Sequence, residues 1–486
     1  MKPQNLLIIM SDEHNIKSLG CYGSSFVKTP NIDALAKRGT RFESTYCTSP
    51  VCIPSRASFA TGKYIHQVGF WDNADPYDGS IPSWHHHLRK RGHEVVSIGK
   101  LHFRSTDDDN GFTEEILPMH VIDGKGDLMG LVRDDLPERG AAKKMVGMAG
   151  PGESMYTRYD RDITAQAQIW LQDKAKQHGD KPWALFVSLV APHFPLTAPA
   201  EHFYRYYNDP NLPMPKLYDK AQRPQHPFLL DYTNSFVYDK HFKSEDDVRR
   251  AVSGYYGLCS FLDEQIGKIM TALEDSGLLG NTRVMYTSDH GDNLGARGAW
   301  GKSTLYEESA AVPLIIAGEG IPENHVVKEP TSHVDTYPFI LESLGEDDNE
   351  TIGNDHLGIS LFELANGRKV ERAVLTEYHG MGSSTAAFMV RFRNLKFVHY
   401  VKYDAQLFDL EKDPEELEDV AKSPAYAEVV KEGYRLLTEI LDPVTVDNRC
   451  RERQAFLLEK NGGREAVIAR GDLGFSVPPG VEAEFI

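Results

Sequence analysis

Short runs rich in apolar residues recur along the chain, separated by segments with helical spacing. The runs stand at residues 5–10, 93–98, 183–190, 283–287 and 312–317. Each has the length of a strand that is buried on both faces. Residues 163–176 and 246–275 carry apolar side chains at the three- and four-residue spacing of amphipathic helices. The alternation predicts an α/β fold in which a large, mixed but mostly parallel sheet is sandwiched by helices.

The pattern changes beyond Gly345. Short alternating runs follow at 372–379, 386–392 and 395–403, and an amphipathic segment follows at 424–441. The last two runs meet at a tight Arg-Asn turn, which predicts a small antiparallel sheet with a helix packed on it.

These patterns divide the chain into three parts. We predict a large catalytic domain at residues 1–370, a small C-terminal α+β domain at 371–450, and a tail at 451–486 that lacks a core of its own. Tails of this kind often dock on a neighbouring subunit, so we predict a homo-oligomer, a homodimer or a homotetramer.

Composition narrows the classes of function. The net charge of −18 and the absence of a basic run argue against nucleic acid as a partner. The apolar opening at residues 6–10 is too short for a signal-peptide core, and no later run approaches membrane-spanning length. The five cysteines include no Cys-x-x-Cys pair, so neither a disulfide framework nor a zinc knot is indicated. We expect a cytoplasmic protein without a membrane partner.

Charged and titratable side chains follow four of the predicted strands. In chain order they are Asp12 and Glu13, then Lys100 and His102, then His193, then Asp289 and His290. Parallel strands end at one edge of a sheet, so these groups are expected to gather there. An acidic pair suits a hard cation, and a fixed cation beside an imidazole suits acyl, phosphoryl or sulfuryl transfer. On these residues alone, Asp12 as a helix cap and His193 as a structural residue remain alternatives.

The segment Cys52-Ile-Pro-Ser-Arg56 predicts the start of a helix. Pro54 fits the first helical turn, and Gly62 can end the helix. Cys52 would then lie at a helix N-terminus, where N–H groups and the helix dipole favour an anion, with Arg56 adding a positive charge. A sulfate or phosphate group would suit this site. A buried structural cysteine is the alternative.

This segment, followed by Thr61-Gly62, resembles the signature of the type I, formylglycine-dependent sulfatases of the alkaline-phosphatase superfamily. Thr29 to Ala36, Ala191-Pro192-His193 and the Gly301-Lys302 segment resemble further motifs of that family, in the same order. The resemblance covers residues 4–345 and is closest in motif to choline-sulfatase-like and arylsulfatase members. It implies an alkaline-phosphatase-like fold and a sulfuric ester hydrolase that releases an alcohol and inorganic sulfate.

The resemblance also implies cofactors. A formylglycine-generating maturation enzyme would oxidise Cys52, and the hydrate of the resulting aldehyde would supply the nucleophile. One divalent metal would be held by Asp12, Glu13, Asp289, His290 and the modified residue 52; glutamate at position 13 departs from the family's aspartate. Oxygen-rich ligands favour Ca²⁺, with Mg²⁺ or Mn²⁺ also admissible.

Catalytic roles are carried over from the family in the same way. Lys100 and Lys302 would neutralise the sulfuryl oxygens, and His193 or Lys302 would protonate the departing alcohol. His102 would take the proton released when sulfate leaves. The catalytic set is thus Cys52, Arg56, Lys100, His102, His193 and Lys302, and the substrate-binding set is Asn73, Lys100, His193 and Lys302.

Two other functions stay open. The first is a phosphonate monoester or phosphodiester hydrolase of the same superfamily; the second is a non-catalytic anion-binding protein with an unmodified Cys52. The loops 104–160 and 199–245 are expected to be irregular and to line the pocket for a small sulfated substrate. Their Asp107, Asp108 and Asp109 and several tyrosines indicate a cationic or aromatic alcohol portion. Choline sulfate, an aryl sulfate and a sulfated sugar all fit.

Overall fold

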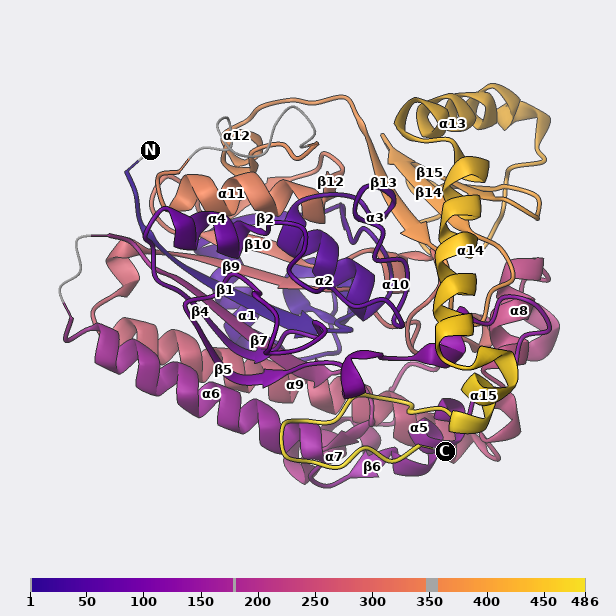
Figure 1. The fold of residues 1–486 in the computed structure, drawn as a ribbon, viewed down its shortest axis with the longest axis horizontal. Coiled ribbons are helices and arrows are strands. Elements are labelled where there is room, and N and C mark those ends of the chain that lie inside the picture. The colour runs from indigo at the N-terminus through magenta and orange to yellow at the C-terminus, as the bar shows by residue number, and fades with distance from the viewer. Residues whose placement is uncertain (1, 178–180, 347–356, 486) are drawn as a thin grey trace.

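The centre of the molecule is an eight-stranded sheet. The computed structural model describes residues 2–177, 181–346 and 357–485. The strand order is β11-β2-β10-β9-β1-β7-β4-β5 (Figure 1). The strands are β1 (Asn5–Asp12), β2 (Gly39–Phe42), β4 (Val95–Lys100), β5 (Glu114–Met119), β7 (Ala184–Pro192), β9 (Thr282–Ser288), β10 (Leu314–Ala317) and β11 (His325–Val327). Strand β10 is antiparallel to both neighbours, and the other pairings are parallel. The predicted mixed, mostly parallel sheet is confirmed.

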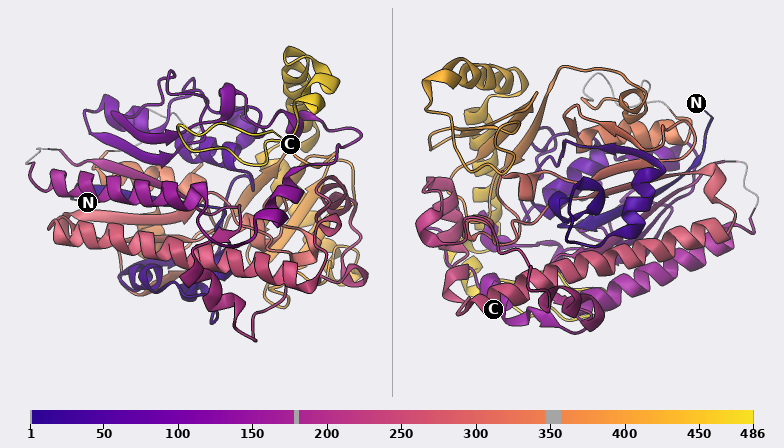
Figure 2. Two further views of the ribbon diagram at one scale, coloured as in Figure 1. Left: turned by 90° about the horizontal axis from the view of Figure 1, so that it is seen from below. Right: turned by 180° about the vertical axis from the view of Figure 1, so that it is seen from behind.

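Helices cover both faces of this sheet (Figures 1 and 2). One face carries α1 (Pro30–Lys37), α6 (Met155–Lys174) and α9 (Glu245–Asp275); the other carries α2 (Cys52–Thr61), α4 (Trp84–Lys90), α11 (Thr336–Ser343) and α12 (Leu361–Ala365). Successive residues of β1 point to opposite faces, so Leu7 and Ile9 join one core while Leu6 and Ile8 join the other. A strand with two buried faces needs the continuous apolar run found in the sequence.

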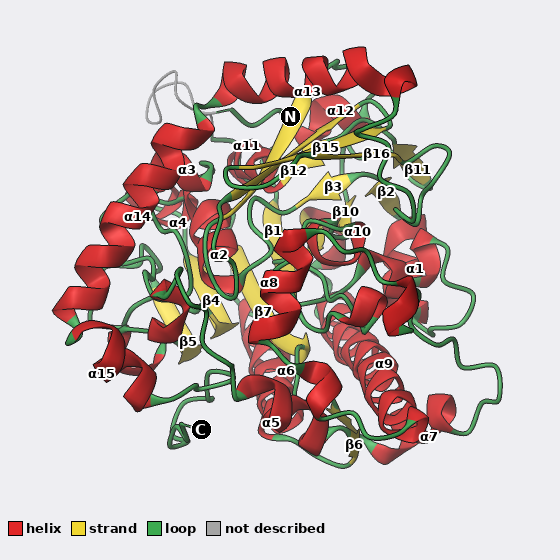
Figure 3. Cartoon of the chain, turned by 90° about the vertical axis from the view of Figure 1, so that its right-hand side faces the viewer, coloured by secondary structure: helices red, strands yellow, loops and turns green. Residues whose placement is uncertain are grey.

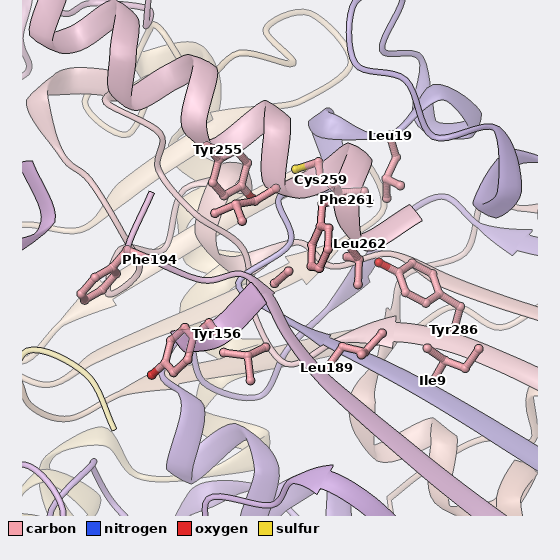
Figure 4. Packing of buried hydrophobic residues seen from close by; sticks show 14 of the residues in the cluster. Ile9, Leu19, Tyr156, Leu189, Phe194, Tyr255, Cys259, Phe261, Leu262 and Tyr286 are labelled. Atoms are coloured by element: carbon pink, nitrogen blue, oxygen red, sulfur yellow. The ribbon is translucent and has the colours of Figure 1, made fainter. Parts of the chain in front are cut away.

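The long helix α9 fixes the segment that follows β1. Its buried Tyr255, Phe261 and Leu262 pack toward Ile9 of β1 and Tyr286 of β9 (Figure 4). The Tyr255 hydroxyl also donates to the carbonyl of Glu13 (2.7 Å) and accepts from the N–H of Asn15 (2.8 Å). Core packing and the position of the acidic pair after β1 are therefore set by the same helix.

A four-stranded antiparallel sheet forms the C-terminal part (Figure 3). It comprises β13 (Ala373–Tyr378), β14 (Ala387–Phe392), β15 (Leu395–Tyr400) and β16 (Gln406–Asp409), with α13 (Ala427–Ile440) packed on it. The predicted small antiparallel sheet is confirmed. Its core includes Phe388 and Leu437 but also Tyr64 and Trp71, so it is continuous with the large domain.

Several segments predicted to be irregular are structured. They contain β5, α5 (Ala141–Met148), α7 (Ala200–Tyr207) and α8 (Pro227–Ser235); the other short elements are β3 (Thr45–Tyr46), β6 (Gly150–Pro151), β8 (Thr197–Ala198), β12 (Thr331–Ser332), α3 (Ile65–Val68) and α10 (Glu307–Ala310). Strand β5 lies at the sheet edge and begins with two glutamates, so it lacks the apolar run of a central strand.

The end of the chain differs from the predicted division. Helix α14 (Pro443–Lys460) begins before residue 451, and α15 (Gly463–Arg470) follows it. The chain then returns, as the yellow loop beyond α15 in Figure 1, to the large domain of the same chain, where Asp472 bonds to Arg139. Contact of this tail with a neighbouring subunit stays a prediction.

Across the residues the structure describes, no helix combines the length and apolar character needed to cross a bilayer.

Candidate active site

Cys52 is the first residue of α2 and is buried beneath the ends of β1 and β9. Its Sγ lies 3.0 Å from Lys302 Nζ, 3.1 Å from His290 Nε2 and 3.7 Å from Asp12 Oδ1. Gly62 ends the helix in the left-handed conformation (φ 66°), which glycine adopts readily. Residues from three distant parts of the sequence thus meet at the predicted nucleophile position.

Arg56, one turn further along α2, holds the two aspartates in place. Its Nε donates to Asp289 Oδ2 (2.8 Å) and its Nη2 to Asp12 Oδ2 (3.0 Å). Its Nη1 donates to the Lys100 carbonyl and to Ser188. The sequence predicted Arg56 as a charge beside the anion, whereas here its fork orients the two carboxylates.

Four side chains could together hold a cation. Ligand atoms of Asp12, Cys52, Asp289 and His290 all lie within 4.8 Å of one another. His290 Nδ1 donates to the Gly291 carbonyl (3.1 Å), which leaves the lone pair of Nε2 facing the group. Burial would raise the pKa of Asp12, but the cations of Lys100 and Arg56 hold it well below its ordinary value. An ionised carboxylate with further oxygen and nitrogen ligands fits a divalent cation.

Glu13 lies outside this group of four. Its backbone has a positive φ of 68°, and its Oε2 lies 3.2 Å from His193 Nε2 and 3.3 Å from Lys302 Nζ. Burial raises the pKa of Glu13 to about 8, with Lys302 acting against it. With Asp12 and His193, however, Glu13 forms a second group whose ligand atoms all lie within 4.8 Å of one another, so the two neighbouring carboxylates stay close together.

Lys302 and His193 form a directed pair. His193 Nδ1 donates to the carbonyl of Phe194 (2.6 Å), so its Nε2 accepts from Lys302 Nζ at 2.8 Å. Burial, followed by Lys302, lowers the pKa of His193 well below its ordinary value, which keeps the ring neutral. Asn293 Nδ2 donates to the Gly301 and Lys302 carbonyls and so fixes the loop that carries the lysine.

Lys100, His102 and Asn73 complete the predicted set. Lys100 Nζ lies 2.6 Å from Asp12 Oδ2, and His102 Nε2 lies 2.7 Å from Ser476 Oγ. Asn73 Oδ1 accepts from the N–H of Ile53 (3.0 Å), so this asparagine caps the start of α2 as well as lining the pocket.

A pocket opens beside Cys52, and both expected loops contribute to it. Gly126, Asp127, Arg139 and Ala141 come from residues 104–160; Tyr232, Phe236 and Tyr238 come from 199–245; Phe194 and Met381 add apolar surface, and Asp472 to Ser476 come from the tail. Sequence reasoning missed Arg139 and the tail, which no motif marks. The aromatic composition of residues 199–245 was the one sequence signal that tyrosines from this loop would line the pocket.

The predicted acidic residues of the first loop lie elsewhere. Asp108 pairs with Arg104, and Asp109 pairs with Arg89 at exposed positions. The acidic residues that do line the pocket are Glu13, Asp127 and Asp472, and the two aspartates pair with Arg139, at 2.8 and 3.0 Å. None of Asp107, Asp108 and Asp109 lines the pocket, and two of them already have arginine partners, so the predicted cation-binding acidic cluster at 107–109 is wrong in its residues.

Comparison with known proteins agrees with this geometry. A family model described as Sulfatase matches residues 4–346, and one described as N-sulphoglucosamine sulphohydrolase, C-terminal, matches residues 295–442. This chain belongs to the sulfatase family. A choline-sulfatase of Rhizobium meliloti (strain 1021) is 34% identical over 86% of this chain and 83% of its own length. An arylsulfatase K of Danio rerio is 28% identical over 93% of this chain and 87% of its own.

Solved structures share the fold. The phosphonate monoester hydrolase of Agrobacterium radiobacter superposes with a TM-score of 0.71 at 22% identity, covering 93% of this chain and 96% of that one. The structure of BT4656 in complex with its substrate D-glucosamine-2-N,6-O-disulfate gives a TM-score of 0.71 at 23% identity, covering 93% of this chain and 99% of that one. The prediction of a sulfuric ester hydrolase with an alkaline-phosphatase-like fold is confirmed by the family match and the relatives. The family generally uses a divalent metal and a formylglycine.

Proposed function

We propose that this sulfatase hydrolyses small organic sulfate esters, with residue 52 as the reacting group. The observation that carries the proposal is the position of Cys52, which lies within 3.1 Å of both Lys302 and His290 and shares a ligand cluster with Asp12 and Asp289. As an unmodified thiol this residue would be a poor nucleophile, because burial, followed by Asp12, raises its pKa to about 12.

A covalent modification and a metal ion would make residue 52 reactive although its thiol is not. A formylglycine formed from Cys52 by a maturation enzyme would supply an oxygen nucleophile, and a divalent ion, Ca²⁺ by the hard-oxygen preference, would polarise the sulfuryl oxygens. Asp12, Asp289 and His290 would hold the ion, and the ion pairs of Arg56 with the two aspartates fix the orientation of their carboxylates.

The chain's own cations and imidazoles supply charge and proton transfer. Lys100 and Lys302 would bind the sulfuryl oxygens, where negative charge accumulates. Lys302 donates to the neutral His193, so the lysine carries the proton for the departing alcohol, and His193 could pass a proton on after receiving it from Lys302.

Pocket shape supports a small alcohol portion. The cavity beside Cys52 is about 70 Å³ and is closed on one side by residues of the tail. Its carboxylates Asp127 and Asp472 are neutralised by Arg139, and its walls include the aromatic rings of Phe194, Tyr232, Phe236, Tyr238 and Phe475. Aromatic walls suit an aryl group by stacking or a quaternary ammonium by cation–π contact. An aryl sulfate or a choline-like sulfate is therefore preferred over an internal sulfate of a polysaccharide.

A phosphonate monoester hydrolase is the second candidate, favoured by its superposition at a TM-score of 0.71. That likeness, at 22% identity, shows the fold alone, whereas the 34% identical relative is a choline-sulfatase. Sulfate is therefore the preferred substrate class.

The test uses full-length protein co-expressed with a formylglycine-generating enzyme. Fragmentation of the tryptic peptide 42–56 should show a loss of about 18 Da at Cys52 and none at Cys47. The values of kcat/KM for 4-nitrophenyl sulfate and choline sulfate should exceed those for an aryl phosphonate monoester and an aryl phosphodiester. Cys52→Ala should abolish all of these activities.

Two outcomes would contradict the proposal. A higher kcat/KM on the phosphonate than on both sulfates would assign the chain to the second candidate. The other outcome is that protein co-expressed with the formylglycine-generating enzyme keeps an unmodified Cys52 and hydrolyses none of these esters. The chain would then be a non-catalytic anion-binding protein.

A further inference from the structure

The last ordered loop of the chain forms part of the active-site wall. Asp472, Phe475 and Ser476 all line the pocket beside Cys52, although they lie more than 400 residues away in sequence. All three side chains are buried, at 1%, 5% and 8% exposure. The family motifs do not include these residues, and the proposed function gives Ser476 no role in the reaction.

The loop is held at both ends by polar contacts. Asp472 accepts from Arg139 Nε (3.1 Å) and Nη2 (3.0 Å) and from the N–H of Ala141 at the start of α5 (3.0 Å). At the other end, the hydroxyl of Tyr156, in the first turn of α6, donates to the Ser476 carbonyl. These bonds fix the backbone of Ser476 and therefore the place of its hydroxyl.

An apolar contact lies between the two anchors. The ring of Phe475 packs edge-on against Tyr156 and Phe194, with centroid distances of 5.5 and 5.7 Å. Phe194 directly follows His193, and its carbonyl accepts from that histidine. The loop thus packs against the same residues that orient the Lys302–His193 pair.

The Ser476 hydroxyl meets His102. Ser476 Oγ lies 2.7 Å from His102 Nε2, while His102 Nδ1 is buried without a hydrogen-bond partner. If Oγ accepts from Nε2–H, the lone pair of the ring lies on Nδ1, which is then the atom free to take a proton. The opposite tautomer would place a proton on Nδ1 with nothing to receive it.

We propose that Ser476 is a positioning residue that holds His102 in the Nε2–H tautomer, with Nδ1 as the proton acceptor of the reaction. The proposal rests on the proposed function for the identity of the reaction, but the tautomer is a property of the folded chain alone. In the step that releases sulfate, the O–H bond of the second hydroxyl on residue 52 and the C–O bond to sulfate would break while the C=O bond of the aldehyde re-forms. The proton would pass to Nδ1 and later to solvent, and no bond to sulfur changes in this step.

The first test reads the tautomer directly. Full-length wild-type protein labelled with ¹⁵N-histidine is compared with a His102→Gln variant, which assigns the His102 signals among the 19 histidines. Burial lowers the pKa of His102 well below its ordinary value, so the ring is neutral at pH 7 and its tautomer can be read. We expect a proton on Nε2 and a bare Nδ1. A proton on Nδ1 would overturn the proposal, whether or not the protein hydrolyses sulfate.

The second test measures turnover in the matured enzyme. Ser476→Ala should lower kcat about tenfold, the effect of one oriented hydrogen bond, with KM little changed. Ser476→Thr keeps a hydroxyl and should restore most of kcat. Val481→Ala, an exposed position in the same tail, is the matched control and should leave both constants unchanged.

Two further measurements keep this result interpretable. Formylglycine content by peptide mass and the thermal midpoint should match the wild type in Ser476→Ala. A wild-type kcat in a folded, fully modified Ser476→Ala protein would overturn the proposal while leaving the proposed function intact. Loss of activity in the wild type itself would refute the proposed function and not the tautomer.

Discussion

At the scale of single residues, the site is defined by which atom of each side chain is left free. Asp12 Oδ2 is taken by Arg56 and Lys100, so Oδ1 is the oxygen that faces Cys52. His290 donates through Nδ1 to a backbone carbonyl, so Nε2 remains as a ligand. The cluster is therefore preorganised for a cation by bonds made outside it.

We predict that His290→Ala lowers the affinity of the full-length protein for a divalent cation by about tenfold or more. The reason is loss of one ligand from a group of four whose other members stay in place. Bound metal is measured by mass spectrometry after dialysis against Ca²⁺, together with the rise in thermal midpoint on adding Ca²⁺. His325→Gln, on the edge strand β11, is the control. Equal metal content in both variants would exclude this cluster as the metal site.

At the scale of elements, helix α6 fixes the end of strand β7. The buried carboxyl of Asp160 accepts from the N–H of Val190 (2.7 Å) and of Ala191 (2.8 Å), just before His193. Burial raises the pKa of Asp160 to about 7, against the effect of these two bonds. The folded chain therefore keeps this proton at a pH where the unfolded chain has lost it.

This difference gives a pH-dependent prediction. Because the folded pKa is raised, the contribution of Asp160 to stability is fully present below about pH 4 and is lost as the pH rises to about 7, at up to about 1.4 kcal/mol per unit. Asp160→Asn does not titrate. We therefore expect urea unfolding to give a wild-type free energy of unfolding that, relative to that of Asp160→Asn, is higher at pH 5 than at pH 7. A difference in unfolding free energy that is equal at both values would contradict the raised pKa.

At the scale of the whole molecule, buried charge joins the two sheets. Lys396 of β15 is fully buried and lies 3.0 Å from Glu307 of α10 and 2.8 Å from Glu416. Helix α10 begins five residues after Lys302, so this junction adjoins the active site. The shared apolar core around Trp71 and Phe388 reinforces it.

Removing the lysine should be costly. Lys396→Met would leave the buried Glu416 and the partly buried Glu307 without this cation, and breaking a buried ion pair typically costs about 3–5 kcal/mol. We expect a lower free energy of unfolding and, near the thermal midpoint, loss of activity together with loss of structure. Lys422→Met removes an exposed ion pair with Asp404 and should leave the unfolding midpoint unchanged. If both variants unfolded alike, the buried junction would not contribute to stability.

The sequence by itself determined the central strands, because a strand buried on both faces must be apolar throughout, as residues 5–10 and 183–190 are. It also determined that Asp12, Lys100, His193 and Asp289 would meet, since parallel strands end at one edge. Edge strand β5 and helices α7 and α8 escaped prediction because partly exposed elements need no continuous apolar pattern.

Only the tertiary structure decided which atoms touch. The contacts of Glu13 with Lys302 and His193 bring together residues about 290 and 180 positions apart, and the contacts of Arg56 join two carboxylates from different strands. The contact between Ser476 and His102 joins residues 374 positions apart, and it depends on the bonds that Arg139 and Tyr156 make to the same loop. Such contacts carry no local signal, because a short polar loop has the same composition whether it meets solvent or an active site.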